Sequence, residues 1–215
     1  MKCNANTVSS SVPKRRQAFT LIEMIGVLAV IAILAALLVP KVFSAINDAR
    51  INGTCISCDT VKTAVADHYG KYGKFDYING TTPLSLPCTN YDTAVLIPEG
   101  LLDKPFVSKL AGGDSQASSH IELGLGTSAG TVSSAASFQY SLDGSSSNSV
   151  ASSPYVLQAH LTSVTAQDAR DLNDRIDGPS LGAVNMTSPD LKGRVEYPAP
   201  SSGIVSDVYI YLTHR

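Results

Sequence analysis

The stretch KRRQAFTLIEMIGVLAVIAILAALLVP, residues 14–40, decides the fold of this 215-residue chain. Within residues 19–39 only Thr20 and Glu23 are markedly polar. A helix that rises about 1.5 Å per residue over this length reaches roughly 30 Å, which matches the hydrocarbon core of a bilayer. The stretch therefore predicts a helix that spans a membrane.

The charges in front of this helix indicate its orientation. Lys14, Arg15 and Arg16 precede the apolar residues, and no cation lies between them and Pro40. Because positively charged residues flanking a span tend to stay in the cytoplasm, we expect the amino terminus on the cytoplasmic side. The chain beyond Pro40 then lies across the membrane.

Glu23 is the unusual residue of the span. A carboxylate among apolar residues in a bilayer costs several kcal/mol unless it has a partner, and the span supplies no cation. Cleavage between Ala18 and Phe19 would create one, the α-ammonium of Phe19, on the same chain or on a neighbouring copy. We favour the neighbour, because a pair between subunits also fixes the axial register of identical helices.

Basic residues, a small residue and the sequence FTLIE at residues 19–23, followed by a long apolar run, resemble the type IV prepilin signature. This family includes the type IV pilins and the pseudopilins of type II secretion. The resemblance implies cleavage after Ala18, N-methylation of Phe19 and an assembly role for Glu23. Pro40 corresponds to a proline that the family commonly carries, where the missing N–H kinks or loosens the helix. The family usually has glycine where this chain has Ala18, which bears on the efficiency of cleavage.

The resemblance further implies a structural subunit with no catalytic residues. Its partners would be the bacterial inner membrane, a prepilin peptidase and methylase, identical or homologous pilin subunits, and an assembly platform with its ATPase. The protein would cross the inner membrane once, with a cytoplasmic amino terminus and an extracytoplasmic head, and assemble into a periplasmic or surface filament. A net charge of -2 and the lack of a basic run beyond Arg16 predict no nucleic-acid partner.

Other classes explain the apolar stretch less well. A secretory signal peptide would place a small residue where this chain has Phe43 in the candidate site at residues 43–45. A single-span anchor for an extracytoplasmic binding module or enzyme explains the length of the stretch but not Glu23. This anchored module is the alternative function.

The sequence divides into four segments: a leader at 1–18, a transmembrane and assembly helix at 19–40, an amphipathic stem helix at 41–72 and a head at 73–215. Apolar residues of the stem recur at steps of three or four, which predicts one buried stripe. Gly53 costs about 1 kcal/mol relative to alanine, which leaves room for a bend or brief break near Asn52 and Gly53. The stripe comprises Ile51, Cys55, Cys58, Val61, Val65, Tyr69 and Tyr72.

The head shows the alternation that is typical of strands. Strands are expected within residues 121–123, 138–142, 155–164, 193–197 and 205–212. A helix is expected after the capping sequence that begins at Thr165, ending before Gly178, and a brief helix at 99–103. The predicted fold class is α+β, with a long N-terminal membrane and stem helix packed on a C-terminal antiparallel sheet, as in a pilin.

Three cysteines beyond the leader allow three interpretations. Cys55, Cys58 and Cys88 could hold zinc with His68 as a fourth ligand, although one CxxC sequence on a helix is a weak metal signal. In an oxidising compartment, Cys88 could form a disulfide with one stem cysteine. The thiols could also stay free and buried.

An acidic cluster suggests calcium only weakly. Asp171, Asn173, Asp174 and Asp177 precede Gly178, but their spacing does not match an EF-hand loop, and acids near a helix end explain them equally well. No other cofactor is expected. Histidines 68, 120, 160 and 214 accompany no nucleophile motif, so the sequence predicts no catalytic site.

Overall fold

The computed structural model describes residues 19–110, 112, 115–126, 138–142, 144, 155–182 and 185–215. The chain divides into two units, Met1–Ser44 and Ala45–Arg215. A long N-terminal apolar helix and a C-terminal antiparallel sheet of several strands give an α+β, pilin-like arrangement. The predicted fold class is confirmed.

The long helix α1 runs over Leu21–Tyr72 and contains Pro40. The helix continues through Asn52 and Gly53, so the brief break that the sequence leaves room for does not form. A glycine inside a helix costs about 1 kcal/mol relative to alanine, and the packing of the stem on either side outweighs this cost. The helix ends at Gly73, whose φ of 70° places it in the left-handed region and whose N–H donates to the Tyr69 carbonyl at 2.7 Å.

The stem part of α1 buries one stripe, as the spacing predicts. Its exact position differs slightly, because Cys55, Tyr69 and Tyr72 are only half-buried. Thr54, Ala64 and His68, which are each adjacent in sequence to a residue of the predicted stripe or one helical turn from it, complete the stripe. The buried residues of α1 are Ile51, Thr54, Cys58, Val61, Ala64, Val65 and His68.

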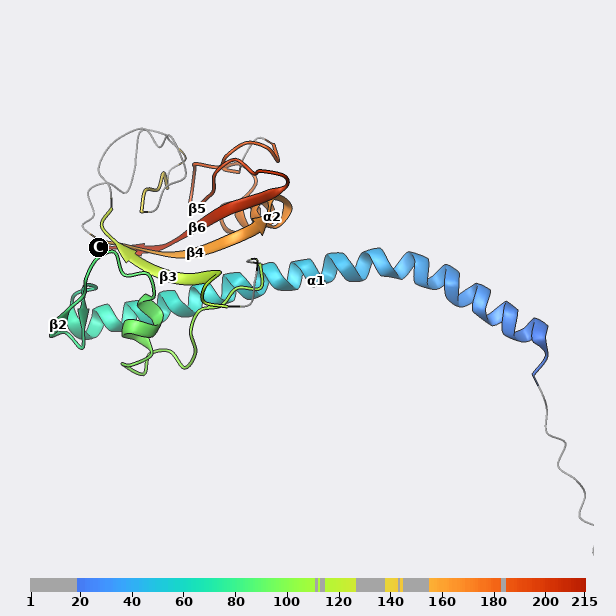
Figure 1. Ribbon diagram of the computed structural model, residues 1–215, viewed down its shortest axis with the longest axis horizontal. Coiled ribbons are helices and arrows are strands. Elements are labelled where there is room, and N and C mark those ends of the chain that lie inside the picture. The colour runs from blue at the N-terminus through green and yellow to red at the C-terminus, as the bar shows by residue number, and fades with distance from the viewer. Residues whose placement is uncertain are drawn as a thin grey trace, which may run out of the picture. The chain divides into compact units, whose positions relative to one another are not determined.

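Four strands of the second unit form one antiparallel sheet in the order β3, β4, β6, β5 (Figure 1). Their bounds are Ser119–Gly124 for β3, Val156–Thr165 for β4, Val195–Glu196 for β5 and Ile204–His214 for β6. Alternate residues of β3, β4 and β6 pack with the stem in one core, since a strand sends successive side chains to opposite faces. These core residues are Ile121, Leu123, Ala159, Leu161, Val208, Ile210 and Leu212.

The helix α2 spans Ala166–Ile176 and connects β4 to the later strands. It begins as predicted at Thr165, whose hydroxyl oxygen accepts the N–H of Asp168 at 3.2 Å. Ala169 and Leu172 are fully buried in the shared core. The amphipathic pattern and the cap thus correctly predict both the start of α2 and its buried face.

Between stem and sheet, a small hairpin pairs β1, Tyr77–Ile78, with β2, Thr82–Pro83. Its turn residues Asn79 and Gly80 both have positive φ, at 50° and 68°, as a tight hairpin turn requires. Next comes η1, Asp92–Leu96, a single wide helical turn.

The brief helix predicted at 99–103 is wrong, because the helical turn η1 lies earlier in the chain. Val95 and Leu96 are fully buried there, and the carboxylate of Asp92 accepts the N–H of Phe106 at 2.7 Å. The burial of these two side chains and the hydrogen bond that Asp92 accepts from Phe106 favour the turn at this position.

The predicted strand at 138–142 is also wrong. Phe138 has a φ of 66°, which is far from an extended strand. Its N–H donates to the side-chain oxygen of Gln158 at 2.9 Å, and the N–H of Ser141 donates to the carboxylate of Glu196 at 3.2 Å. This segment therefore lies against the polar face of the sheet and bonds to its side chains instead of pairing as a strand.

Candidate functional site

The N-terminal part of α1 exposes a continuous apolar surface. Every described residue from Phe19 to Ile46 is exposed, and Phe19 itself retains 83% of its surface. Among the helices that the structure describes, α1 alone is long and apolar enough to cross a membrane, judged by length and composition. A long, largely apolar surface of this kind marks a site that lipid or other protein chains cover.

Glu23 has local partners that the sequence analysis missed. Its Oε2 accepts both the N–H and the hydroxyl of Thr20, each at 2.8 Å, and the Glu23 N–H donates to the Thr20 hydroxyl oxygen at 3.4 Å. This reciprocal arrangement is a capping box, which satisfies donors at the start of a helix. The signal was present in the sequence as threonine followed three residues later by glutamate.

The cap changes how the carboxylate of Glu23 is understood. It has hydrogen-bond donors within its own turn, although the apolar residues around it still supply no cation. Ala18, the residue before the predicted cut, lies outside the described residues, and Phe19 is exposed at the start of the described chain. The capped carboxylate therefore stands one turn from the residue that would carry the new ammonium group.

A family comparison decides what this segment is. The chain matches the family model of the prokaryotic N-terminal methylation motif over residues 13–39. This is the prepilin-type signature. The prepilin motif covers the junction between Ala18 and Phe19, the capped Glu23 and most of the exposed apolar surface. It indicates a precursor like those of type IV pilins and pseudopilins. No curated protein and no solved structure matches the chain.

The three cysteines beyond the leader form no disulfide among the described residues. Cys55, Cys58 and Cys88 are free cysteines, so the structure does not contain the predicted disulfide from Cys88. Cys88 is instead held next to β3, where it exchanges backbone hydrogen bonds with Leu123 at 2.8 and 2.9 Å. Burial raises the pKa of all three thiols, which disfavours the thiolate that binds metal.

His68, the fourth ligand considered for zinc, is also engaged elsewhere. His68 is fully buried, and its Nδ1 lies 2.6 Å from Oε2 of Glu99. The other carboxylate oxygen of Glu99 accepts the N–H of Asn79 at 2.7 Å. His68 thus joins the stem to the hairpin turn, and the described residues do not assemble it with the cysteines into a metal site.

The acidic cluster of α2 is distributed among separate partners. Asp177 accepts Nε of Arg194 at 3.0 Å and the backbone N–H groups of Arg194 and Val195 at 2.6 and 2.9 Å. Asn173 donates to Asp190, and Asp171 accepts the side-chain amide of Gln167 at 2.8 Å. Protein groups therefore bond to Asp171, Asn173 and Asp177, and the weak indication of calcium gains no support from these contacts.

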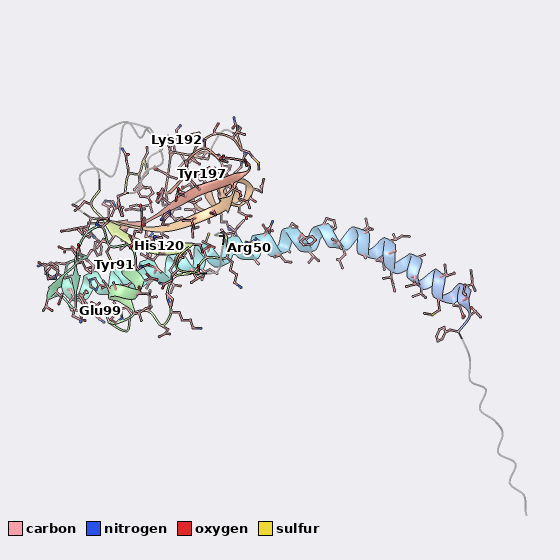
Figure 2. All side chains as sticks on the ribbon, viewed as in Figure 1. Arg50, Tyr91, Glu99, His120, Lys192 and Tyr197 are labelled. Carbon is pink, nitrogen blue, oxygen red and sulfur yellow. The ribbon has the colours of Figure 1, made fainter. Side chains whose placement is uncertain are left out.

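A second group of polar side chains gathers where the sequence analysis expected nothing. His120 and Glu122 of β3 and His160 of β4 lie on the face of the sheet opposite the stem; His120 is labelled in Figure 2. Glu122 Oε1 lies 3.0 Å from Nε2 of His120 and 3.3 Å from Nδ1 of His160. His160 Nε2 in turn lies 3.0 Å from Oδ1 of Asp207.

Hydrogen bonds within this group shift the pKa values of Glu122 and His160. Burial alone would raise the pKa of Glu122, but hydrogen bonds from His120, His160 and Gln158 outweigh it and hold that pKa well below the usual range. For His160 the effects are opposite in sign. Burial lowers its pKa, but its hydrogen bonds to Glu122 and Asp207 raise the pKa by more, so the net shift is upward. The two carboxylates therefore favour the protonated form of His160.

Proposed function

We propose that the chain is the precursor of a structural subunit of a type IV pilus or a type II secretion pseudopilus. It is cleaved between Ala18 and Phe19, methylated on Phe19 and held in the inner membrane with its amino terminus in the cytoplasm. Subunits then leave the membrane by packing their apolar helices together. The observation that carries this proposal is the exposed apolar surface at the start of α1, most of which lies within the prepilin motif.

Physical chemistry supports assembly through this surface. A helix that is apolar on all sides is stable only in lipid or among other apolar helices. Moving it from lipid into a filament core keeps it away from water at both stages. The prepilin motif favours such a structural role over an enzyme, and the proposed partners are the processing peptidase, other subunits and the assembly machinery.

Glu23 gives the assembly its register in this proposal. Its carboxylate pairs with the Phe19 ammonium of the adjacent subunit. At 4 Å two opposite charges attract by about 1 kcal/mol in water and about 4 kcal/mol at the effective dielectric of a protein surface. The interaction is therefore strong enough to select one axial position among identical helices, while the Thr20 cap requires only a hydrogen-bond acceptor.

Three substitutions separate the charge of Glu23 from its capping role. Glu23→Gln keeps an acceptor for the Thr20 donors but removes the charge, and Glu23→Ala removes both. Thr20→Val keeps the size of the side chain and the charge of Glu23 but removes the capping hydroxyl. Each full-length variant is expressed in a host that supplies prepilin peptidase and a cognate assembly system, and membrane insertion, processing and filament yield are measured together.

We expect all three variants to insert, and we expect Thr20→Val to form filaments at close to the wild-type yield. Both Glu23 variants should lose most of their filaments, because neither can pair with an ammonium. Normal filaments from Glu23→Gln would contradict the register role and leave only a capping role. A wild-type protein that inserts, is never cleaved and never assembles would support the anchored-module alternative instead.

A further inference from the structure

The polar face of the sheet brings two imidazoles and a carboxylate to one point. The antiparallel register places His120 directly opposite His160, and Glu122 lies two residues further along β3 on the same face. One donor atom from each of the three residues lies within 4.8 Å of the other two. This proximity comes from strand pairing, so it is built into the sheet rather than into a loop.

The distances within the group suit a small divalent cation. Zinc binds histidine nitrogen and carboxylate oxygen at about 2.0 to 2.2 Å with tetrahedral geometry, which places neighbouring donor atoms about 3.3 Å apart. Glu122 Oε1 already lies 3.0 Å from His120 Nε2 and 3.3 Å from His160 Nδ1. Two of the three distances between the protein donor atoms are therefore near the values that a zinc site requires.

Surrounding residues orient the ligands as metal sites require. The carboxylate of Asp207 can only accept, so His160 donates its Nε2–H to Asp207, which leaves Nδ1 facing Glu122. Gln158 Nε2 donates to Glu122 Oε2 at 2.6 Å, which directs Oε1 toward the histidines. The other side-chain atom of Gln158, Oε1, accepts the hydroxyl of Tyr140 at 2.9 Å. These contacts fix the rotamers of two ligands before any ion binds.

The group is also accessible from solvent. The side chains of His120 and His160 are each 14% exposed, and that of Glu122 is 10% exposed. An ion can therefore enter without opening the core. Histidine with carboxylate suits zinc, whereas calcium and magnesium favour sites made of oxygen ligands alone.

We propose that His120, Glu122 and His160 bind one Zn²⁺ ion on the outer face of the sheet. The three protein ligands leave a fourth position for water or for a ligand from another molecule. Because β3 is one of the two edge strands of the sheet, the ion ties this edge to β4. The site is independent of the N-terminal assembly segment and adds a binding function to the head.

The test uses the full chain in detergent micelles, purified without a histidine tag so that no added imidazole competes. Zinc content is measured after dialysis, and zinc affinity is measured by titration with ZnCl₂. We compare the wild type with Glu122→Gln and His160→Gln, which preserve side-chain size. His214→Gln is the matched control, because His214 is an exposed histidine of the same sheet that lies outside the group. Circular dichroism checks that each variant is folded.

We expect one Zn²⁺ per chain in the wild type and in His214→Gln, with affinity reduced at least about tenfold in both ligand variants. Asp207→Asn should weaken binding about tenfold without abolishing it, as loss of an orienting carboxylate does. Calcium and magnesium should not compete.

Substitution with Co²⁺ gives a second readout that does not depend on affinity. Nitrogen and oxygen ligands should produce the visible bands of a tetrahedral ion without thiolate charge transfer. Thiolate bands would assign the ion to the cysteines and overturn the proposal. Absence of stoichiometric zinc, or equal zinc in Glu122→Gln, would overturn it as well.

Discussion

Glu196 is a carboxylic acid in the interior of the head. It is fully buried on β5, and the N–H of Ser141 donates to its Oε1 at 3.2 Å. Within the part of the chain that the structure describes, its Oε2 has no hydrogen-bond partner. Burial, partly offset by Ser141 and reinforced by the charges of Asp190 and Asp177, raises the pKa of this carboxyl to about 8.

This raised pKa makes the stability of the head depend on pH. Between about pH 4.5, the ordinary value, and about pH 8, the folded state holds a proton on Glu196 that the unfolded state has released. Because the folded state binds more protons in this window, its stability falls as the pH rises. Burying the Glu196 carboxyl therefore lowers the free energy of unfolding least at acidic pH and most at alkaline pH.

Glu196→Gln should remove this dependence, because glutamine resembles the protonated acid and never ionises. We expect the variant to be more stable than the wild type at pH 8, by on the order of 3 kcal/mol, and nearly equal to it at pH 4.5. Denaturant unfolding of the full chain in detergent at both pH values measures this. Asp67→Asn, on the exposed side of α1, should change stability little at either pH.

At the scale of elements, α2 shows how much of the fold can be predicted from sequence. The capping sequence at Thr165 and the spacing of Ala169 and Leu172 predict the helix because both signals are local. The strands β4 and β6 were predicted for the same reason, since each alternates over a long segment. Elements whose form depends on distant partners were predicted less well.

Phe138 illustrates such a failure. Its segment alternates like a strand, but the segment bonds to side chains of Gln158 and Glu196, which no local pattern reveals. The group of His120, Glu122 and His160 was missed for a related reason. It exists only because β3 pairs with β4 in one register, and the sequence gives no direct measure of that register.

The cap of α2 gives a prediction at this scale. Thr165→Ala should lower the free energy of unfolding by about 1 kcal/mol, because the N–H of Asp168 loses its acceptor at the helix start. Thr60→Ala is the matched control. Thr60 lies on the exposed side of α1, where its hydroxyl donates to the carbonyl of Ile56 at 2.9 Å inside an intact helix.

Alanine favours a helix interior, so the control substitution should change stability by no more than about 0.5 kcal/mol. Chemical unfolding followed by circular dichroism compares the two variants. Equal losses from both would show that the Thr165 hydroxyl does not act as a cap.

At the scale of the whole molecule, the proposed function requires a mature chain that differs from the precursor. We expect intact-mass and terminal-peptide analysis of protein from its native host to find a chain that begins at Phe19 and carries one methyl group on its amine. Ala18→Gly should increase the cleaved fraction, because glycine is the usual residue at this position in the prepilin family that the chain resembles. A mature start at Ile46, or uncut chains in assembled filaments, would contradict the proposed processing.

The capping box at the start of α1 uses only half of the Glu23 carboxylate. Both Thr20 donors reach Oε2, and no hydrogen bond to Oε1 occurs in the part of the chain that the structure describes. A carboxylate oxygen has lone pairs to spare, so Oε1 can receive an ammonium group while Oε2 keeps the cap. In the proposed filament, one side chain would then set where its own helix begins and where the adjacent helix begins. A shift in the start of its own helix would shift the start of the adjacent helix by the same amount. A single helical turn would therefore set the spacing of subunits along the whole fibre.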